Sequence, residues 1–172
     1  GTKIRSGVSW IWNQRRFGQK WGSKYSDPSL ETRYDASLVP GYLKGVETLE
    51  ITADLEMKEV QFPGQPYEGY FLDLFAGGVP PQNGMSYWHY GVEGATYLDL
   101  YHQNRVLMFR LLYEGVNGIE SKIPFTSLPR LGGAKRLRGY PRDRFRDNNV
   151  AVGTLEYHYP IHPFHYQLQI FF

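Results

Sequence analysis

The stretch that decides the fold class reads Thr48-Leu49-Glu50-Ile51-Thr52-Ala53-Asp54-Leu55-Glu56-Met57-Lys58. Its odd-numbered residues are all apolar, and its even-numbered residues are all polar or charged. Successive side chains of a β-strand point to opposite faces, whereas a helix would mix the two sets on each face. The stretch therefore predicts a β-strand with one apolar and one polar face.

The same alternation recurs along the rest of the chain, and no stretch has a helical period. Turn residues separate the alternating segments, and a glycine- and proline-bearing loop is expected over residues 77–84. The pattern predicts an all-β chain of about eight to nine strands of roughly ten residues, in antiparallel up-and-down order. Besides the opening stretch, the predicted strands cover residues 3–14, 29–39, 70–76, 92–101, 107–114, 154–161 and 164–172.

Such a sheet can close into a barrel in two ways. With the apolar face outward it is a transmembrane β-barrel, and with that face inward it is a soluble lipid-binding barrel. Large apolar residues on consecutive strands, aromatic residues near strand ends and charges on the polar faces favour the membrane. Cysteine is absent and the net charge is only +2, so neither a disulfide framework nor a general polyelectrolyte role is expected.

The longest interruption of the alternation, residues 115–149, is strongly basic. Its central part, 128–147, carries seven Lys or Arg against two Asp. Complementary charge favours a loop that folds into the barrel, because an arginine in a narrow lumen must pair with a carboxylate. A solvated surface loop or a phosphate-binding arm is the alternative. The polar faces of the strands are mostly acidic, with Glu50, Asp54, Glu56, Asp73, Glu93, Asp99 and Glu156 against Lys58 and Arg110.

Three segments carry a family resemblance. The loop contains Leu137-Arg138-Gly139-Tyr140, the strand after it contains Leu155-Glu156-Tyr157, and an upstream segment reads Tyr67-Glu68-Gly69-Tyr70-Phe71-Leu72-Asp73-Leu74. Over about residues 50–172 the chain resembles the BamA/TamA-type outer-membrane assembly proteins, also called the bacterial surface antigen family. Their long extracellular loop carries a Val/Leu-Arg-Gly-Phe/Tyr motif and folds back into the barrel.

The resemblance implies a role for each residue of the loop motif. Arg138 would pair with an acidic group on the strand after the loop, for which Glu156 is the best partner. Gly139 would let the backbone turn close to the wall, and Tyr140 would wedge against that wall. Leu137 completes the motif. Supporting loop residues would be Gly132, Gly133, Arg144 and Asp147.

The resemblance also implies a larger barrel and a function. The family barrel has roughly sixteen strands, and an eight-stranded interior is just filled by side chains. Residues 1–172 are therefore expected to form a single outer-membrane β-barrel domain or part of one. The implied role is insertion, assembly or translocation of proteins at the bacterial outer membrane. Expected partners are outer-membrane lipid, client outer-membrane proteins and periplasmic or lipoprotein accessory subunits. A passive pore and the membrane anchor of a surface enzyme are the alternatives.

No catalytic residue, metal site, cofactor or nucleic-acid partner is expected. His158, His162 and His165 form the only histidine cluster, and polar rim residues are favoured over a metal site because no carboxylate has suitable spacing. Hydrolase elbows and dinucleotide fingerprints are absent from the sequence. The basic loop lacks the interleaved aromatic residues on which bases stack.

Overall fold

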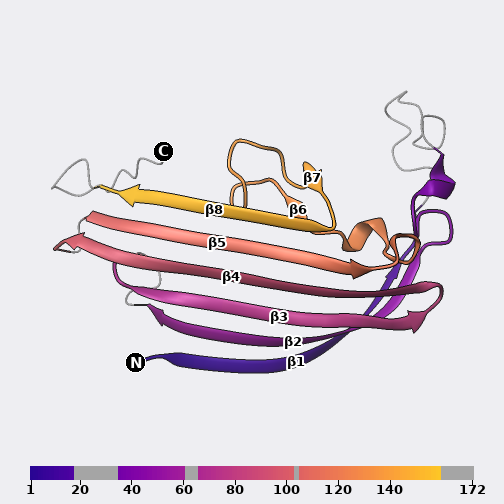
Figure 1. The fold of residues 1–172 in the computed structure, drawn as a ribbon, viewed down its shortest axis with the longest axis horizontal. Helices are drawn as coiled ribbons and strands as arrows, with labels where there is room; N and C mark the ends of the chain where they lie inside the picture. Colours follow the sequence, from indigo (N-terminus) through magenta and orange to yellow (C-terminus); the bar gives the residue numbers. More distant parts are fainter. Residues whose placement is uncertain (18–34, 61–65, 103–104, 160–172) are drawn as a thin grey trace.

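Six long strands form one antiparallel sheet in the computed structural model, which describes residues 1–17, 35–60, 66–102 and 105–159. The order in the sheet is β1-β2-β3-β4-β5-β8 (Figure 1), so long strands that are consecutive in the sequence are neighbours in the sheet. This confirms the all-β, antiparallel, up-and-down prediction. The strands are β1 (Lys3–Arg15), β2 (Val46–Val60), β3 (Gly69–Gln82), β4 (Met85–Tyr101), β5 (Arg105–Gly118) and β8 (Asn149–His158).

The described strands form an open sheet and not a closed barrel. β1 and β8 are its two edges, and each has one hydrogen-bonded neighbour among the described residues. The predicted strand over 164–172 lies outside the described residues. Figure 1 shows β1 and β2 bending away from the other strands at the end nearest η1 (Ala36–Leu38).

The predicted strand over residues 29–39 is wrong in its described part. Asp35 precedes η1, and its carboxylate accepts hydrogen bonds from the backbone nitrogen of Ser37 at 2.9 Å and from the Ser37 hydroxyl at 2.6 Å. Such local side-chain bonds give the backbone an alternative to a strand. Alternating polarity alone does not reveal this competition.

The loop predicted over residues 77–84 is also wrong. β3 continues through Pro80 and Pro81, and only Asn83 and Gly84 form the turn to β4. Both turn residues have positive φ, +50° and +82°, as a tight hairpin of the favoured hand requires. The register shifts between Val79 and Gln82, so the prolines sit at an irregular point where a strand tolerates them.

The register gives the sheet an apolar face and a polar face. Ile51 lies between Trp10 of β1 and Gly78 of β3, and Leu74 lies between Leu55 and Val92. We call this side the apolar face, and the side bearing Glu50, Glu114 and Glu156 the polar face. Side chains of the apolar face are exposed: Val8, Trp10, Trp12, Ile51, Leu74, Trp88, Leu98, Leu100, Phe109, Leu111 and Leu155.

The buried core lies on the polar side, under the chain that follows β5. Val79, Tyr87 and Val116 of the sheet pack against Ile123, with Leu128 beside them. The covering chain runs over residues 119–148. It is slightly shorter than the loop predicted over residues 115–149. It holds η2 (Glu120–Lys122), η3 (Phe125–Ser127) and a small hairpin of β6 (Arg130–Leu131) and β7 (Phe145–Arg146). We call residues 119–148 the inner loop.

Candidate functional site

The inner loop is held over the polar face by arginine–glutamate pairs. Arg110 of β5 begins the series: its Nε and Nη2 lie 2.8 Å and 2.5 Å from Oε1 of Glu93 on β4. The third nitrogen of the guanidinium, Nη1, donates to the backbone carbonyl of Lys135 in the loop. One arginine on the sheet therefore neutralises a wall carboxylate and binds the loop backbone.

Arg136 makes the fork-to-fork contact between loop and sheet. Its Nη1 donates to Oε2 of Glu114 on β5 at 2.6 Å, and Nη2 pairs with Oε1 of the same carboxylate. Nη1 also donates to the carbonyl of Arg130 at 3.0 Å. The Glu114 side chain is 15% exposed, so most of its charge is withdrawn from water. Bidentate pairs of this kind are among the stronger side-chain contacts.

Arg138 lies against Glu156, the partner expected from the sequence. Arg138 Nη1 is 2.7 Å from Glu156 Oε1, and the glutamate side chain is 6% exposed against 53% for the arginine. His158 Nε2 lies 3.1 Å from the other oxygen, Oε2. Both oxygens of a buried carboxylate thus have partners, one from the loop and one from its own strand.

The rest of the motif forms a tight turn. The nitrogen of Leu137 donates to the carbonyl of Gly133 at 3.1 Å, and the nitrogen of Gly133 donates to the carbonyl of Tyr140 at 2.9 Å. Gly139 has φ +87°, a conformation that glycine adopts at little cost. Tyr140 does not act as the predicted wall wedge: it is 51% exposed and its ring packs on Phe145 of the loop.

The four predicted supporting residues differ in what they do. Gly132 is essential to the loop geometry, because it has φ +124° and an added Cβ would lie 2.1 Å from the carbonyl oxygen of Pro141. Gly133 also has positive φ, +85°. The side chain of Arg144 is exposed and makes no ion pair with the described residues. Asp147 donates its backbone nitrogen to the carbonyl of Pro129 at 3.4 Å.

Sequence reasoning missed Arg136, Glu114 and the bridging role of Arg110. The motif predicts a role for Arg138, although Arg136 makes the closer contact, a two-point contact with Glu114. Arg136 and Arg138 are two residues apart, and their partners Glu114 and Glu156 lie on the adjacent strands β5 and β8. The pairing across those strands became visible only in the folded sheet.

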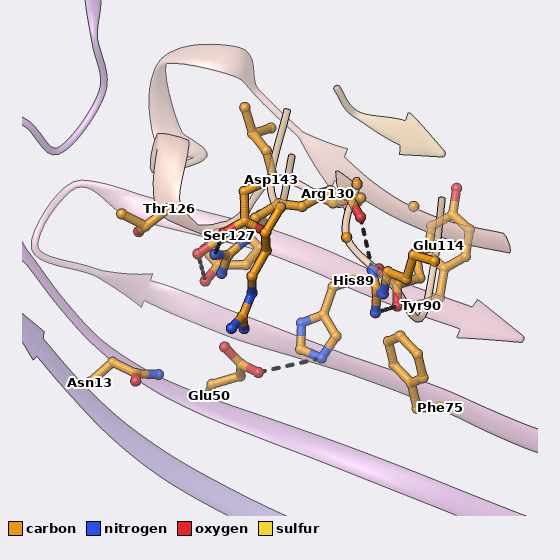
Figure 2. Close-up of a pocket in the computed structure, with 18 of the residues that line it drawn as sticks. Asn13, Glu50, Phe75, His89, Tyr90, Glu114, Thr126, Ser127, Arg130 and Asp143 are labelled. Carbon is orange, nitrogen blue, oxygen red and sulfur yellow. Dashed lines mark hydrogen bonds and ion pairs between the residues drawn. The ribbon is translucent and has the colours of Figure 1, made fainter. Parts of the chain in front are cut away.

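A cavity of 720 Å³ lies between the polar face and the inner loop. Figure 2 shows Glu50 and His89 on the sheet side, facing Ser127, Arg130 and Asp143 of the loop. His89 Nε2 lies 3.0 Å from the Thr52 hydroxyl and 3.6 Å from Glu50 Oε1. The cavity lining includes neither Arg138 nor Glu156, so it is separate from that pair.

No protein-family model and no curated protein matches this sequence. In the described part of the chain, no helix has the length and apolar character to cross a membrane. Within those same residues, no group of three or more His, Asp or Glu side chains is placed to hold a metal ion. Of the predicted histidine cluster, His158 contacts Glu156, and His162 and His165 lie outside the described residues.

Proposed function

We propose that this chain forms an outer-membrane β-barrel of the BamA/TamA type and assists the insertion or translocation of other proteins at the bacterial outer membrane. The proposal combines the arrangement of the sheet, the placement of the loop motif and the sequence resemblance. It involves no bond-breaking chemistry.

The exposed apolar face supports a membrane location. Trp10 is 74% exposed, Phe109 50% and Leu155 62%, and they lie on the edge strands β1 and β8 and on β5 beside β8. Apolar patches of this extent mark interaction or membrane surfaces. In lipid, this face would meet acyl chains, and the charged face would line a lumen. β1 and β8, each with one neighbour among the described strands, would then pair with further strands, because lipid offers the backbone no hydrogen bonds.

The single observation that carries the proposal is the ion pair of Arg138 with Glu156. The motif arginine lies over the polar face, and its partner is a buried glutamate on the strand that follows the loop. This is the arrangement that the family resemblance predicts for an inward-folded loop. A solvated surface loop would have no reason to place a guanidinium 2.7 Å from a carboxylate that is 6% exposed.

In the proposed mechanism the inner loop braces the wall while a seam between two barrel strands opens. An opened edge presents unpaired N–H and C=O groups, and these can template an incoming strand of a client protein. Arg136 and Arg138 would hold β5 and β8 in register during that movement. The partners are outer-membrane lipid, client barrel proteins and accessory periplasmic or lipoprotein subunits.

The test is insertion of a client barrel into liposomes that contain the purified chain. We expect insertion above that of empty liposomes, and a clear loss with Arg138→Ala. Arg144→Ala, which removes an exposed arginine of the same loop, is the control and should retain insertion. Ion conductance without client insertion would instead identify a passive pore. A chain that stays in solution without detergent would identify a soluble barrel.

A further inference from the structure

The cavity under the inner loop carries an excess of positive charge. Its cationic lining residues come from the end of β1, from β6 and from the turn that follows, and its acidic ones come from β2, β5 and the loop. The cations are Arg15, Arg130, Lys135, Arg136 and Arg142, and the carboxylates are Glu50, Glu114 and Asp143. With His89 neutral, five positive charges therefore face three negative ones.

Two of the three carboxylates pair with arginines of the inner loop. Asp143 lies 3.2 Å from Arg130. Glu114 is held by the fork of Arg136. Glu50 lies 3.6 Å from His89 Nε2. Because His89 is counted as neutral, the charge of Glu50 offsets one of the remaining cations and leaves the excess of two positive charges.

Three cations of the cavity lining have no carboxylate partner among the described residues. Arg15, Lys135 and Arg142 form no ion pair with any described residue. They border a common cavity but come from two distant parts of the sequence. Like charges gathered in this way repel one another, and an anion placed between them would relieve that repulsion.

We propose that this cavity binds an anionic ligand through a phosphate group. A phosphate monoester carries a charge of about −1.5 to −2 at neutral pH, which matches the excess of two positive charges in the lining. Its oxygens suit the planar fork of arginine and the point charge of lysine. Asn13 and Ser127 add neutral hydrogen-bonding groups, and the volume is that of a small-molecule site.

This inference stands independently of the proposed membrane-assembly function. It uses the cavity lining and its charges, and neither Arg138 nor Glu156 belongs to that lining. A phosphate site would be retained in a barrel that serves as a pore, and its absence would leave the insertion experiment unaffected.

The experiment is isothermal titration of the full chain in neutral detergent at low salt. Three probes are compared: inorganic pyrophosphate, dihexanoyl phosphatidic acid and citrate. We expect saturable binding of a phosphate probe at one site. Arg142→Gln and Lys135→Gln should each weaken that binding about tenfold, because each removes a charge-assisted contact. Arg144→Gln removes an equal charge outside the cavity and should change the affinity less than twofold.

The probes also separate the sources of the phosphate group. Binding of pyrophosphate supports a soluble ligand, and binding of phosphatidic acid alone supports a lipid head group. Failure of both to bind would overturn the proposal. So would tighter binding of citrate than of either phosphate, or an equal loss of affinity in Arg142→Gln and Arg144→Gln.

Discussion

At the scale of single residues, Glu156 shows how a charge is accommodated in the sheet. Its side chain is nearly buried, yet Arg138 contacts one oxygen and His158 the other. An isolated buried carboxylate would be costly, because burial removes its water without replacing the lost hydrogen bonds. Glu156 is therefore stable at this position only while the inner loop stays folded over it.

Arg138→Ala should destabilise the folded chain by about 1–2 kcal/mol. The expected cost lies below that of a fully buried pair, because the arginine is half exposed and partly screened by solvent. Denaturant unfolding in detergent measures it, and a double-mutant cycle with Glu156→Gln isolates the pairwise energy. Arg144→Ala should stay within about 0.5 kcal/mol of the parent. A coupling energy indistinguishable from zero would refute the role given to this pair.

Gly132→Ala should disrupt the inner loop, because the added methyl group would meet the carbonyl oxygen of Pro141 at 2.1 Å. Gly139→Ala is the matched variant: it also has positive φ, but nothing lies within 4 Å of its added Cβ. Backbone strain alone costs about 1–2 kcal/mol, so Gly132→Ala should cost more than Gly139→Ala. Chymotrypsin cleavage after Phe145 reports the loosening. Equal cleavage rates in the two variants would contradict the steric argument.

At the scale of elements, the inner loop is fastened at successive points along its length. Near its start, Phe125 packs on the rings of Phe17 and Tyr42, and Ser127 lies 2.8 Å from the Tyr87 hydroxyl. Arg136 and Arg138 then attach it to β5 and β8. The first attachment is largely apolar and aromatic, and the later ones are ionic, so salt should loosen the loop from its charged end.

Arg136→Ala should release the charged end of the inner loop from β5. Glu114 would lose both bonds of the fork while remaining mostly buried, at a cost of about 2–3 kcal/mol. Hydrogen exchange should rise over residues 129–148 and change little in β3. Arg142→Ala removes the same charge without breaking an ion pair to any described residue, and it serves as the control. Similar exchange in both variants would show that the fork does not anchor the loop.

At the scale of the whole molecule, the two faces of the sheet have opposite roles. The polar face is covered in part by the inner loop and holds the buried side chains, whereas the apolar face carries large exposed residues from β1 to β8. In a water-soluble sheet the apolar face would normally be the covered one. This inversion is the strongest physical argument for lipid around the sheet.

Spin labels on neighbouring residues test the inversion. The chain has no cysteine, so Leu155→Cys and Thr154→Cys can each be labelled at a single site on opposite faces of β8. In vesicles, we expect the label at 155 to collide with lipid-soluble oxygen and the label at 154 to be shielded from it. A labelled Lys122→Cys in the exposed η2 marks aqueous accessibility. The membrane assignment fails if the label at 155 is as accessible to a water-soluble nickel complex as that at 122.

The sequence by itself determined most of the long strands and their two faces, and the family resemblance pointed to Glu156 as the partner of Arg138. Alternation is a local property, so part of each strand from β1 to β5 could be assigned from its own residues, although β3 extends to Gln82 and β4 begins at Met85, beyond the predicted strands. Complementary charge between the loop and the strands was also visible without coordinates. Local side-chain hydrogen bonding at Asp35 was missed because polarity patterns do not report backbone competition. The tight turn at Asn83-Gly84 was missed because the glycines and prolines before it are typical of a loop, although β3 runs through them.

Only the tertiary structure decided which cations of the inner loop form ion pairs and which do not. Arg136, Arg138 and Arg142 are chemically identical side chains. Arg136 binds Glu114 and Arg138 contacts Glu156, whereas Arg142 lines the cavity without an ion pair to any described residue. Their partners are set by the register of β5 against β8 and by the turn that Gly132 permits. Both features bring together residues distant in the chain, so no pattern within a single segment could specify them.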